Sequence, residues 1–270
     1  MMPRISARSF FTIVVAGAAA CSDSAAPVGR VTESLLTRDV AIDAADATVQ
    51  DLAQIAGIEL MAGMPLASSS TSAASPFAGC TYNPSSLLIG CPSVTTPDGL
   101  TLNRFFEIFA ADTMQRTYDA VATDSLLSST WLTGTLAKSD RTVWLSHSRL
   151  MMVTGLTGSE TKRTWRGFGT RDDSAHINKD GVVRTTRVIS TDEIHDLVYR
   201  VPRADFPFPQ SGTVTNEVTV SSTTPNGTEA TNRQGTRHVV ITFDGTQTAS
   251  VLVGETQCAL DLVSRKLTCE

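Results

Sequence analysis

Two histidines stand among acidic residues, in a pattern that could support acid–base or metal chemistry. A carboxylate beside an imidazole can bind a divalent cation or act as a general base. Strand alternation, however, would point His195 and Asp196 to opposite faces. A turn at residues 180 and 181 would place His176 near Thr185. We therefore expect solvated loops and strand ends here, and predict no catalytic, cofactor-binding or metal site. The two acidic segments are Asp172–His176 and Asp192–Asp196.

Two tryptophans are candidates for ligand contact. If Thr157 and Gly158 form a two-residue turn, Leu150 lies opposite Trp165, and Trp144 then shares a face with Trp165. A pair of exposed indoles could stack on a sugar ring or another flat ligand. The alternative is that both are bulky residues of a core that contains few aromatics.

Five cysteines predict a disulfide framework with one thiol left over. Cys80 and Cys91 enclose ten residues, as do Cys258 and Cys269. Pairing the second two as hairpin partners sets Leu260 against Leu267 and Asp261 against Lys266. Among the three possible connectivities, we predict two local hairpin disulfides with a structural role. The odd thiol is Cys21.

The first 21 residues resemble a bacterial lipoprotein signal peptide. Arg4 and Arg8 precede the eleven-residue apolar run 10–20, which ends at Cys21. This run is too short to span a bilayer as a helix, which takes about 20 residues. The resemblance implies cleavage before Cys21, lipidation of that cysteine and attachment to the membrane of a bacterial cell envelope. Ser22 after the cysteine favours the outer membrane. Ala18-x-Ala20 also suits cleavage by ordinary signal peptidase, which would give a secreted protein without lipid. The third alternative is that the N-terminal segment is not cleaved and acts as the anchor.

Composition limits the partners. The chain has a formal net charge of −5, or −7 without the two arginines of residues 1–20. A chain this acidic does not attract phosphate backbones, so we expect no nucleic acid partner.

A single helix is expected near the N-terminus. After a flexible tether at residues 21–37, apolar residues recur every three or four positions and predict a helix over 38–62 with one buried face. Its four aspartates are expected on a solvated face, since they lack the spacing of a calcium loop. A linker follows at 63–79. The predicted buried face is Ile42, Ala45, Val49, Leu52, Ala56 and Leu60.

Residues 80–270 read as an antiparallel β domain. β-branched and aromatic residues alternate with polar ones in runs of five to ten, separated by turn signals such as Asp180–Gly181 and Asp244–Gly245. In the clearest runs, Val214, Val218 and Val220 share one face, as do Val239, Ile241 and Phe243. The fold class is mainly β: a large antiparallel meander, open or curled into a half-barrel or sandwich, with the helix packed on it.

The segments 155–170, 201–220 and 239–253 resemble those of uncharacterised bacterial lipoproteins built from long β-meanders. The resemblance implies a fold and a cellular location but no activity. We therefore expect a non-enzymatic, lipid-anchored envelope protein with a structural or ligand-binding role. The alternative is an envelope hydrolase that uses acidic residues and a histidine. A half-barrel that shelters an acyl chain is disfavoured by the mixed polarity of Thr161–Thr170.

Overall fold

The computed structural model describes residues 33–61, 79–137, 140–179, 182–226 and 229–269. All of them belong to one compact unit, residues 31–270. The tether over 21–32, the linker over 63–78 and Cys21 itself lie outside the described residues. None of the described residues forms a helix with the length and apolar character that a membrane crossing requires.

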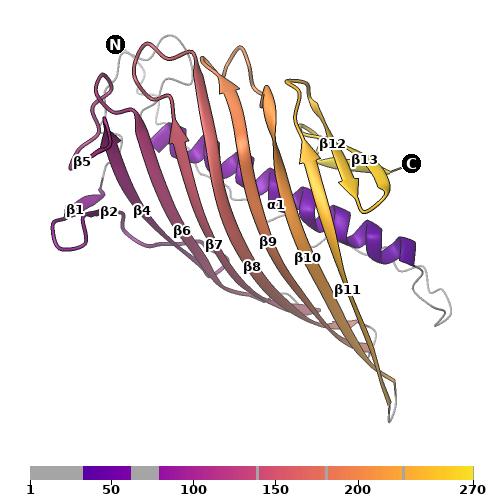
Figure 1. The fold of residues 1–270 in the computed structure, drawn as a ribbon. Helices are drawn as coiled ribbons and strands as arrows, with labels where there is room; N and C mark the ends of the chain where they lie inside the picture. Colours follow the sequence, from indigo (N-terminus) through magenta and orange to yellow (C-terminus); the bar gives the residue numbers. More distant parts are fainter. Residues whose placement is uncertain (1–32, 62–78, 138–139, 180–181, 227–228, 270) are drawn as a thin grey trace, which may run out of the picture. The chain divides into compact units, whose positions relative to one another are not determined.

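Fourteen strands of the described chain form one antiparallel sheet (Figure 1). Strands that follow each other in sequence also pair in space, so the sheet is a meander, and β3 and β5 both flank β4. The sheet is strongly curved but does not close on itself. The predicted fold class is confirmed, in its open form. The strands are β1 (Thr81–Asn83), β2 (Leu88–Gly90), β3 (Val94–Thr95), β4 (Leu100–Ala110), β5 (Thr113–Gln115), β6 (Ser125–Ala137), β7 (Arg141–Thr154), β8 (Lys162–Lys179), β9 (Val182–Arg200), β10 (Ser211–Asn226), β11 (Glu229–Thr242), β12 (Thr248–Val253), β13 (Thr256–Asp261) and β14 (Lys266–Cys269).

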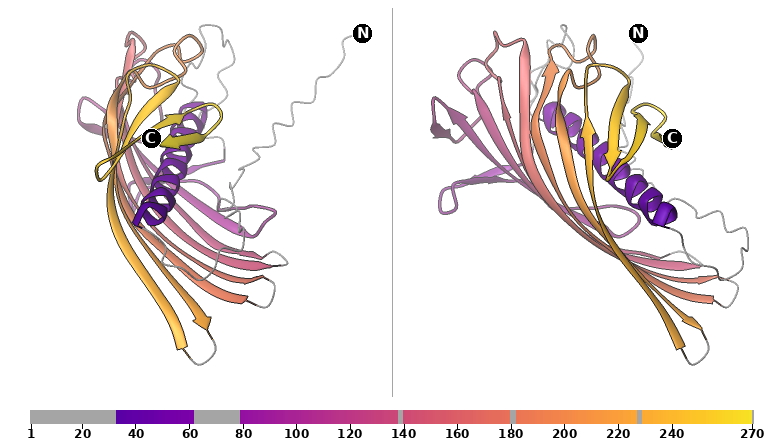
Figure 2. Two further views of the ribbon diagram at one scale, coloured as in Figure 1. Left: turned by 90° about the vertical axis from the view of Figure 1, so that its right-hand side faces the viewer. Right: turned by 45° about the vertical axis from the view of Figure 1, so that its right-hand side comes forward.

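Helix α1 (Glu33–Met61) packs on the concave face of the sheet, where it contacts β10, β11, β12 and β14 (Figure 2). It begins five residues before the predicted start at residue 38. The physical reason is that no glycine or proline stands between Gly29 and the predicted start, while Leu35 and Leu36 are good helix formers.

The buried face of α1 is partly the predicted one. Ala45 and Val49 are buried as expected, whereas Ile42, Leu52 and Ala56 are only half-buried. Small side chains let the helix approach the sheet closely. The residues of α1 that are fully or almost fully buried are Val40, Ala41, Ala44, Ala45, Ala47, Thr48, Val49, Asp51, Ile55, Ile58 and Glu59.

Both predicted disulfides are confirmed. Cys80 bonds Cys91 and Cys258 bonds Cys269, each with a Cα–Cα distance of 4.0 Å. The second pair sits in the predicted register, with Leu260 opposite Leu267 and Asp261 opposite Lys266. This register buries Cys258 and Leu260 in the core, and it fixes the turn between β13 and β14.

Candidate ligand-binding site

A row of polar residues crosses the concave face of the sheet beneath α1, among buried apolar side chains. The register makes its members direct cross-strand neighbours, so their side chains share one face. Neighbouring positions on the same face, such as Met151, Ile194 and Val214, are buried and apolar. The members of this polar row are Arg104, Thr130, Arg149, Gly169, Asp192 and Asn216, from β4, β6, β7, β8, β9 and β10.

Arg149 connects this polar row to the helix. Its guanidinium reaches across β8 to form an ion pair with Asp192, and its other terminal nitrogen pairs with Asp51 of α1. The crossing depends on Gly169, because a Cβ there would lie 2.5 Å from Nη1 of Arg149. Glycine thus provides the space through which one strand's side chain reaches past the next.

Asp51 was expected on a solvated face, and that prediction is wrong. Its side chain is 2% exposed, because the helix turns it toward Arg149 rather than toward solvent. Burial raises the pKa of Asp51 to about 6, and Arg149 opposes that shift. One turn further on, Gln54 donates a hydrogen bond of 2.5 Å from its amide to the Thr130 hydroxyl.

A second charged cluster holds the C-terminal part of α1. Glu59 is fully buried and accepts hydrogen bonds from Arg163 at 3.4 Å and from Arg203 at 2.7 Å. Arg203 also stacks on the ring of Tyr199, 3.9 Å from its centroid. Two guanidinium groups therefore share one carboxylate, and the cluster carries a net positive charge.

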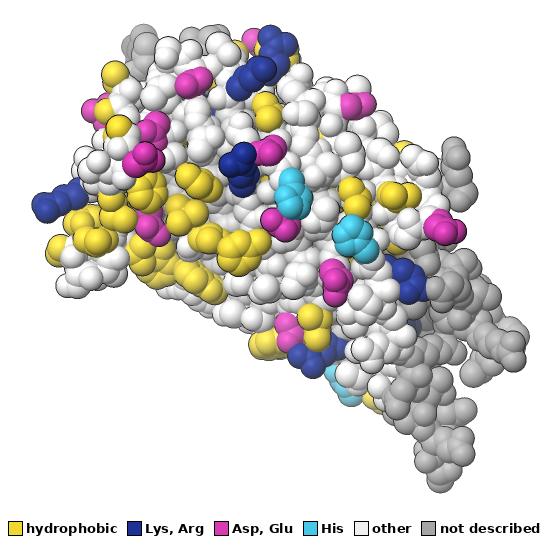
Figure 3. Space-filling view, in the orientation of Figure 1, with side chains coloured by type: hydrophobic (Ala, Val, Ile, Leu, Met, Phe, Trp, Pro, Cys, Tyr) yellow, Lys and Arg dark blue, Asp and Glu magenta, His cyan; other side chains and the backbone are white. Residues whose placement is uncertain are grey.

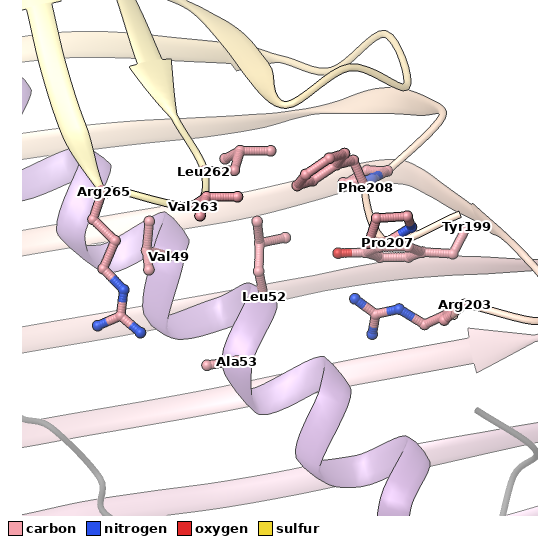
Figure 4. Close-up of a pocket in the computed structure, with 11 residues that line it drawn as sticks. Val49, Leu52, Ala53, Tyr199, Arg203, Pro207, Phe208, Leu262, Val263 and Arg265 are labelled. Atoms are coloured by element: carbon pink, nitrogen blue, oxygen red, sulfur yellow. The ribbon is translucent and has the colours of Figure 1, made fainter. Parts of the chain in front are cut away.

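A pocket of about 230 Å³ opens beside this cluster (Figure 4). Val49, Leu52 and Ala53 of α1 form one wall, the turn between β13 and β14 forms a second, and the segment after β9 forms a third. Figure 4 shows Leu52 in the middle, with Arg203 on one side and Arg265 on the other. The other lining residues are Tyr199, Pro207, Phe208, Pro209, Leu262 and Val263.

No family model, curated protein or solved structure matches this chain.

The two tryptophans do not form a joint platform. Trp165 is 0% exposed in the core, whereas Trp144 is 43% exposed on the opposite, convex face. The prediction that they share a face is wrong, because residues 155–161 form a longer connection and Val153, not Leu150, lies opposite Trp165. A shift by an odd number of residues exchanges the two faces of a strand.

A different aromatic group lies on the convex face. Phe105 and Trp131 meet edge to face with ring centroids 5.5 Å apart. Exposed Met152 and Phe168 follow on β7 and β8, where apolar side chains gather in Figure 3. This surface is convex, so it offers a small molecule less enclosure than the pocket does.

The acidic segments differ from the prediction of solvated loops and strand ends. Asp173 and Asp192 are buried in the middle of β8 and β9, each held by an arginine. The partner of Asp173 is Arg171, two residues earlier on β8, whereas the partner of Asp192 is Arg149 of β7, which the local sequence does not reveal. Among the described residues, no group of three His, Cys, Asp or Glu side chains could hold a metal ion.

His176 lies opposite Thr185, as predicted. His195 and Asp196, in contrast, are both exposed, because a β-bulge with φ of 46° at Asp196 breaks the alternation. Burial instead brings together His147 and Asp173, at 2.8 Å. Arg171 also pairs with Asp173 and compensates the charge on which a general-base histidine would depend.

The residues that connect α1 to the sheet were not predicted from the sequence. Asn216 stands between buried Val214 and Val218 on the inward face of β10, while Arg149 and Asp192 are each followed two residues later by a buried apolar side chain, Met151 and Ile194. The signal that could have identified them is a polar residue at a strand position where the alternation predicts an apolar, inward-facing side chain. Glu59 and Arg203 carry no such signal, since the fold alone brings them together.

Proposed function

We propose that this chain is a lipid-anchored protein of the bacterial cell envelope that binds a small molecule between α1 and the sheet and has no catalytic role. The observation that carries the binding role is the pocket, in which apolar side chains from three separate segments surround a few polar groups. Such a combination is typical of ligand sites. The anchor rests on the sequence around Cys21, and the two disulfides agree with an oxidising compartment.

A structural role alone would not explain why the walls of the pocket are held in fixed positions. The buried cluster around Glu59 holds α1 against the sheet and fixes one wall of the pocket. The Cys258–Cys269 disulfide fixes the wall formed by the turn between β13 and β14. Two independent devices thus position the walls, which is the preorganisation that small-molecule binding requires.

The test is extraction of the protein from membranes of its native host, followed by mass spectrometry of the compounds that it retains. The wild-type chain should retain a compound that Ala53→Trp excludes, because a tryptophan at this exposed lining position fills the pocket. The control is Ala137→Trp, at an exposed position at the end of β6. A compound retained equally by both variants would place binding elsewhere, and no retained compound would contradict the proposal.

A further inference from the structure

The pocket presents charge of one sign at the ends of an apolar floor. Arg203 and Arg265 flank Leu52, and Figure 4 shows their guanidinium groups on either side of it. Phe208, Leu262 and other apolar side chains complete the lining. A molecule that fills this space would meet hydrocarbon along its length and a cation near its end.

The negative charges nearby are withdrawn from the pocket. Glu59 is fully buried and already accepts from both Arg163 and Arg203, so one carboxylate faces two guanidinium groups. Asp46 lies within electrostatic reach of Arg265, but burial raises its pKa and so disfavours its charge. Asp261, beside Leu262, has a lowered pKa because the Ser264 backbone N–H donates a hydrogen bond to it, but its carboxylate is already bound there and does not line the pocket. Among the described residues that line the pocket, the charged ones are Arg203 and Arg265, which favours an anion.

Tyr199 adds a polar group at the base of the site. Its side chain is fully buried, and the Arg203 guanidinium stacks on its ring, 3.9 Å from the centroid. Figure 4 shows the Tyr199 hydroxyl directed toward Leu52, inside the pocket. Tyr199 thereby holds Arg203 in place beside the pocket.

The size of the pocket limits the ligand. Its volume of about 230 Å³ is below the range of roughly 300 to 1,000 Å³ that drug-sized ligands occupy. A pocket of this size suits one short hydrocarbon chain, with a head group at the rim.

From these features we infer that the ligand is an amphiphile with a single short apolar tail and an anionic head group. This inference rests on the proposed function and names the chemical class of its ligand. The tail lies along Leu52, Phe208 and Leu262, and the guanidinium of Arg203 or Arg265 pairs with the anionic head.

Three probes of equal chain length test the charge requirement: octanoate, octanol and octylammonium. Their binding is measured by equilibrium dialysis against the full chain in lipid nanodiscs, with empty nanodiscs as the baseline for partition into lipid. Octanoate should bind most tightly, by about fivefold or more over octanol, and its affinity should fall as salt rises. Octylammonium should bind most weakly.

Val263 offers a matched pair of variants, because it lines the pocket and is 65% exposed, so that either charge is tolerated there. Val263→Asp should weaken octanoate binding about fivefold, and Val263→Arg should strengthen it by a similar factor. Arg265→Gln should weaken it, whereas Arg166→Gln, on an exposed side chain paired with Asp196, should not.

Two outcomes separate this inference from the proposed function. If octanol binds as tightly as octanoate and the two Val263 variants do not differ, the pocket binds apolar molecules without regard to charge, and the anionic class is wrong while the binding role stands. If none of the three probes binds and the extracted protein retains no compound, the binding role itself is wrong.

Discussion

At the scale of single residues, the attachment of α1 depends on one arginine and one glycine. Arg149 is the cation of two carboxylates, Asp51 on the helix and Asp192 on β9. Gly169 provides the only side-chain-free position in the polar row, at the point where the guanidinium crosses β8. The pair therefore acts as a unit, and substituting either residue should disturb the same ion pairs.

Gly169→Ala tests this arrangement. Replacing a strand glycine with alanine ordinarily helps folding, because glycine loses more backbone entropy. Here the new Cβ would displace the guanidinium and leave Asp192 buried without its cation, so we expect a loss of about 3 kcal/mol in the free energy of unfolding. Urea denaturation of the disulfide-intact chain measures it.

The control is the same substitution in an Arg149→Met background. With no guanidinium to displace, Gly169→Ala should cost little, and the double-mutant cycle should give a coupling above about 1 kcal/mol. Additive losses would mean that the alanine acts through the backbone of β8 and not through Arg149.

The buried Asp51 predicts a pH dependence of stability. Its pKa is raised from 3.8 to about 6 in the folded state, so folding favours the protonated form. Asp51 thus contributes fully to the free energy of unfolding below about pH 4. As the pH rises through 6 this contribution, which is about 3 kcal/mol at most, is lost. Relative to wild type, Asp51→Asn should be more stable at pH 7 than at pH 4, as measured by urea denaturation at both values.

Asp172→Asn is the matched control, because its shift has the opposite sign. A side-chain hydrogen bond from Arg187 lowers the pKa of this exposed carboxyl. Its stabilising contribution is therefore present at neutral pH and is lost on acidification. If Asp51→Asn changed with pH in the same direction as Asp172→Asn, attraction to Arg149 would outweigh burial at Asp51.

At the scale of elements, the turn between β13 and β14 connects a disulfide to the pocket. Leu262, Val263 and Arg265 stand in this turn, between the cysteines of the Cys258–Cys269 bond. Replacing both cysteines with alanine should lower the free energy of unfolding by about 3 kcal/mol, since a short loop is no longer closed in the unfolded chain. It should also weaken ligand binding, because one wall of the pocket is then less fixed.

Replacing Cys80 and Cys91 gives the comparison. This bond encloses a loop of the same length at the other end of the sheet. The stability loss should be similar, whereas binding at the pocket should be unchanged when measured well below the unfolding transition. Equal effects on binding would show that the pocket responds to global stability and not to its own wall.

The strands of the sheet could be predicted from the sequence better than the residues of the binding site. Period-two alternation and turn residues predicted the meander, and the cysteine spacing predicted the register of β13 and β14. The pairing of Trp165 was missed, because its register depends on the length of an irregular connection. The polar row was missed because a charge at an inward position is stable only with partners that are distant in sequence, such as Asp51 and Arg149.

At the scale of the whole molecule, the pocket and the proposed anchor depend on different parts of the chain. The pocket needs a rigid body, which the sheet, α1 and two disulfides provide. In the proposed function, attachment depends on the lipid at Cys21. The two roles should therefore be separable by single substitutions.

Cys21→Ser should release the protein from the membrane without altering the folded body. Each buried methylene contributes about 0.8 kcal/mol, so two or three acyl chains hold a protein firmly, and their loss leaves little to replace them. In the native host, the wild-type chain should sediment with membranes and yield an acylated N-terminal peptide by mass spectrometry. The Cys21→Ser chain should remain in the supernatant, whereas the Cys80 and Cys91 double variant should still sediment. A wild-type N-terminus at residue 21 without lipid would favour plain secretion, and retention of residues 1–20 would favour an uncleaved anchor.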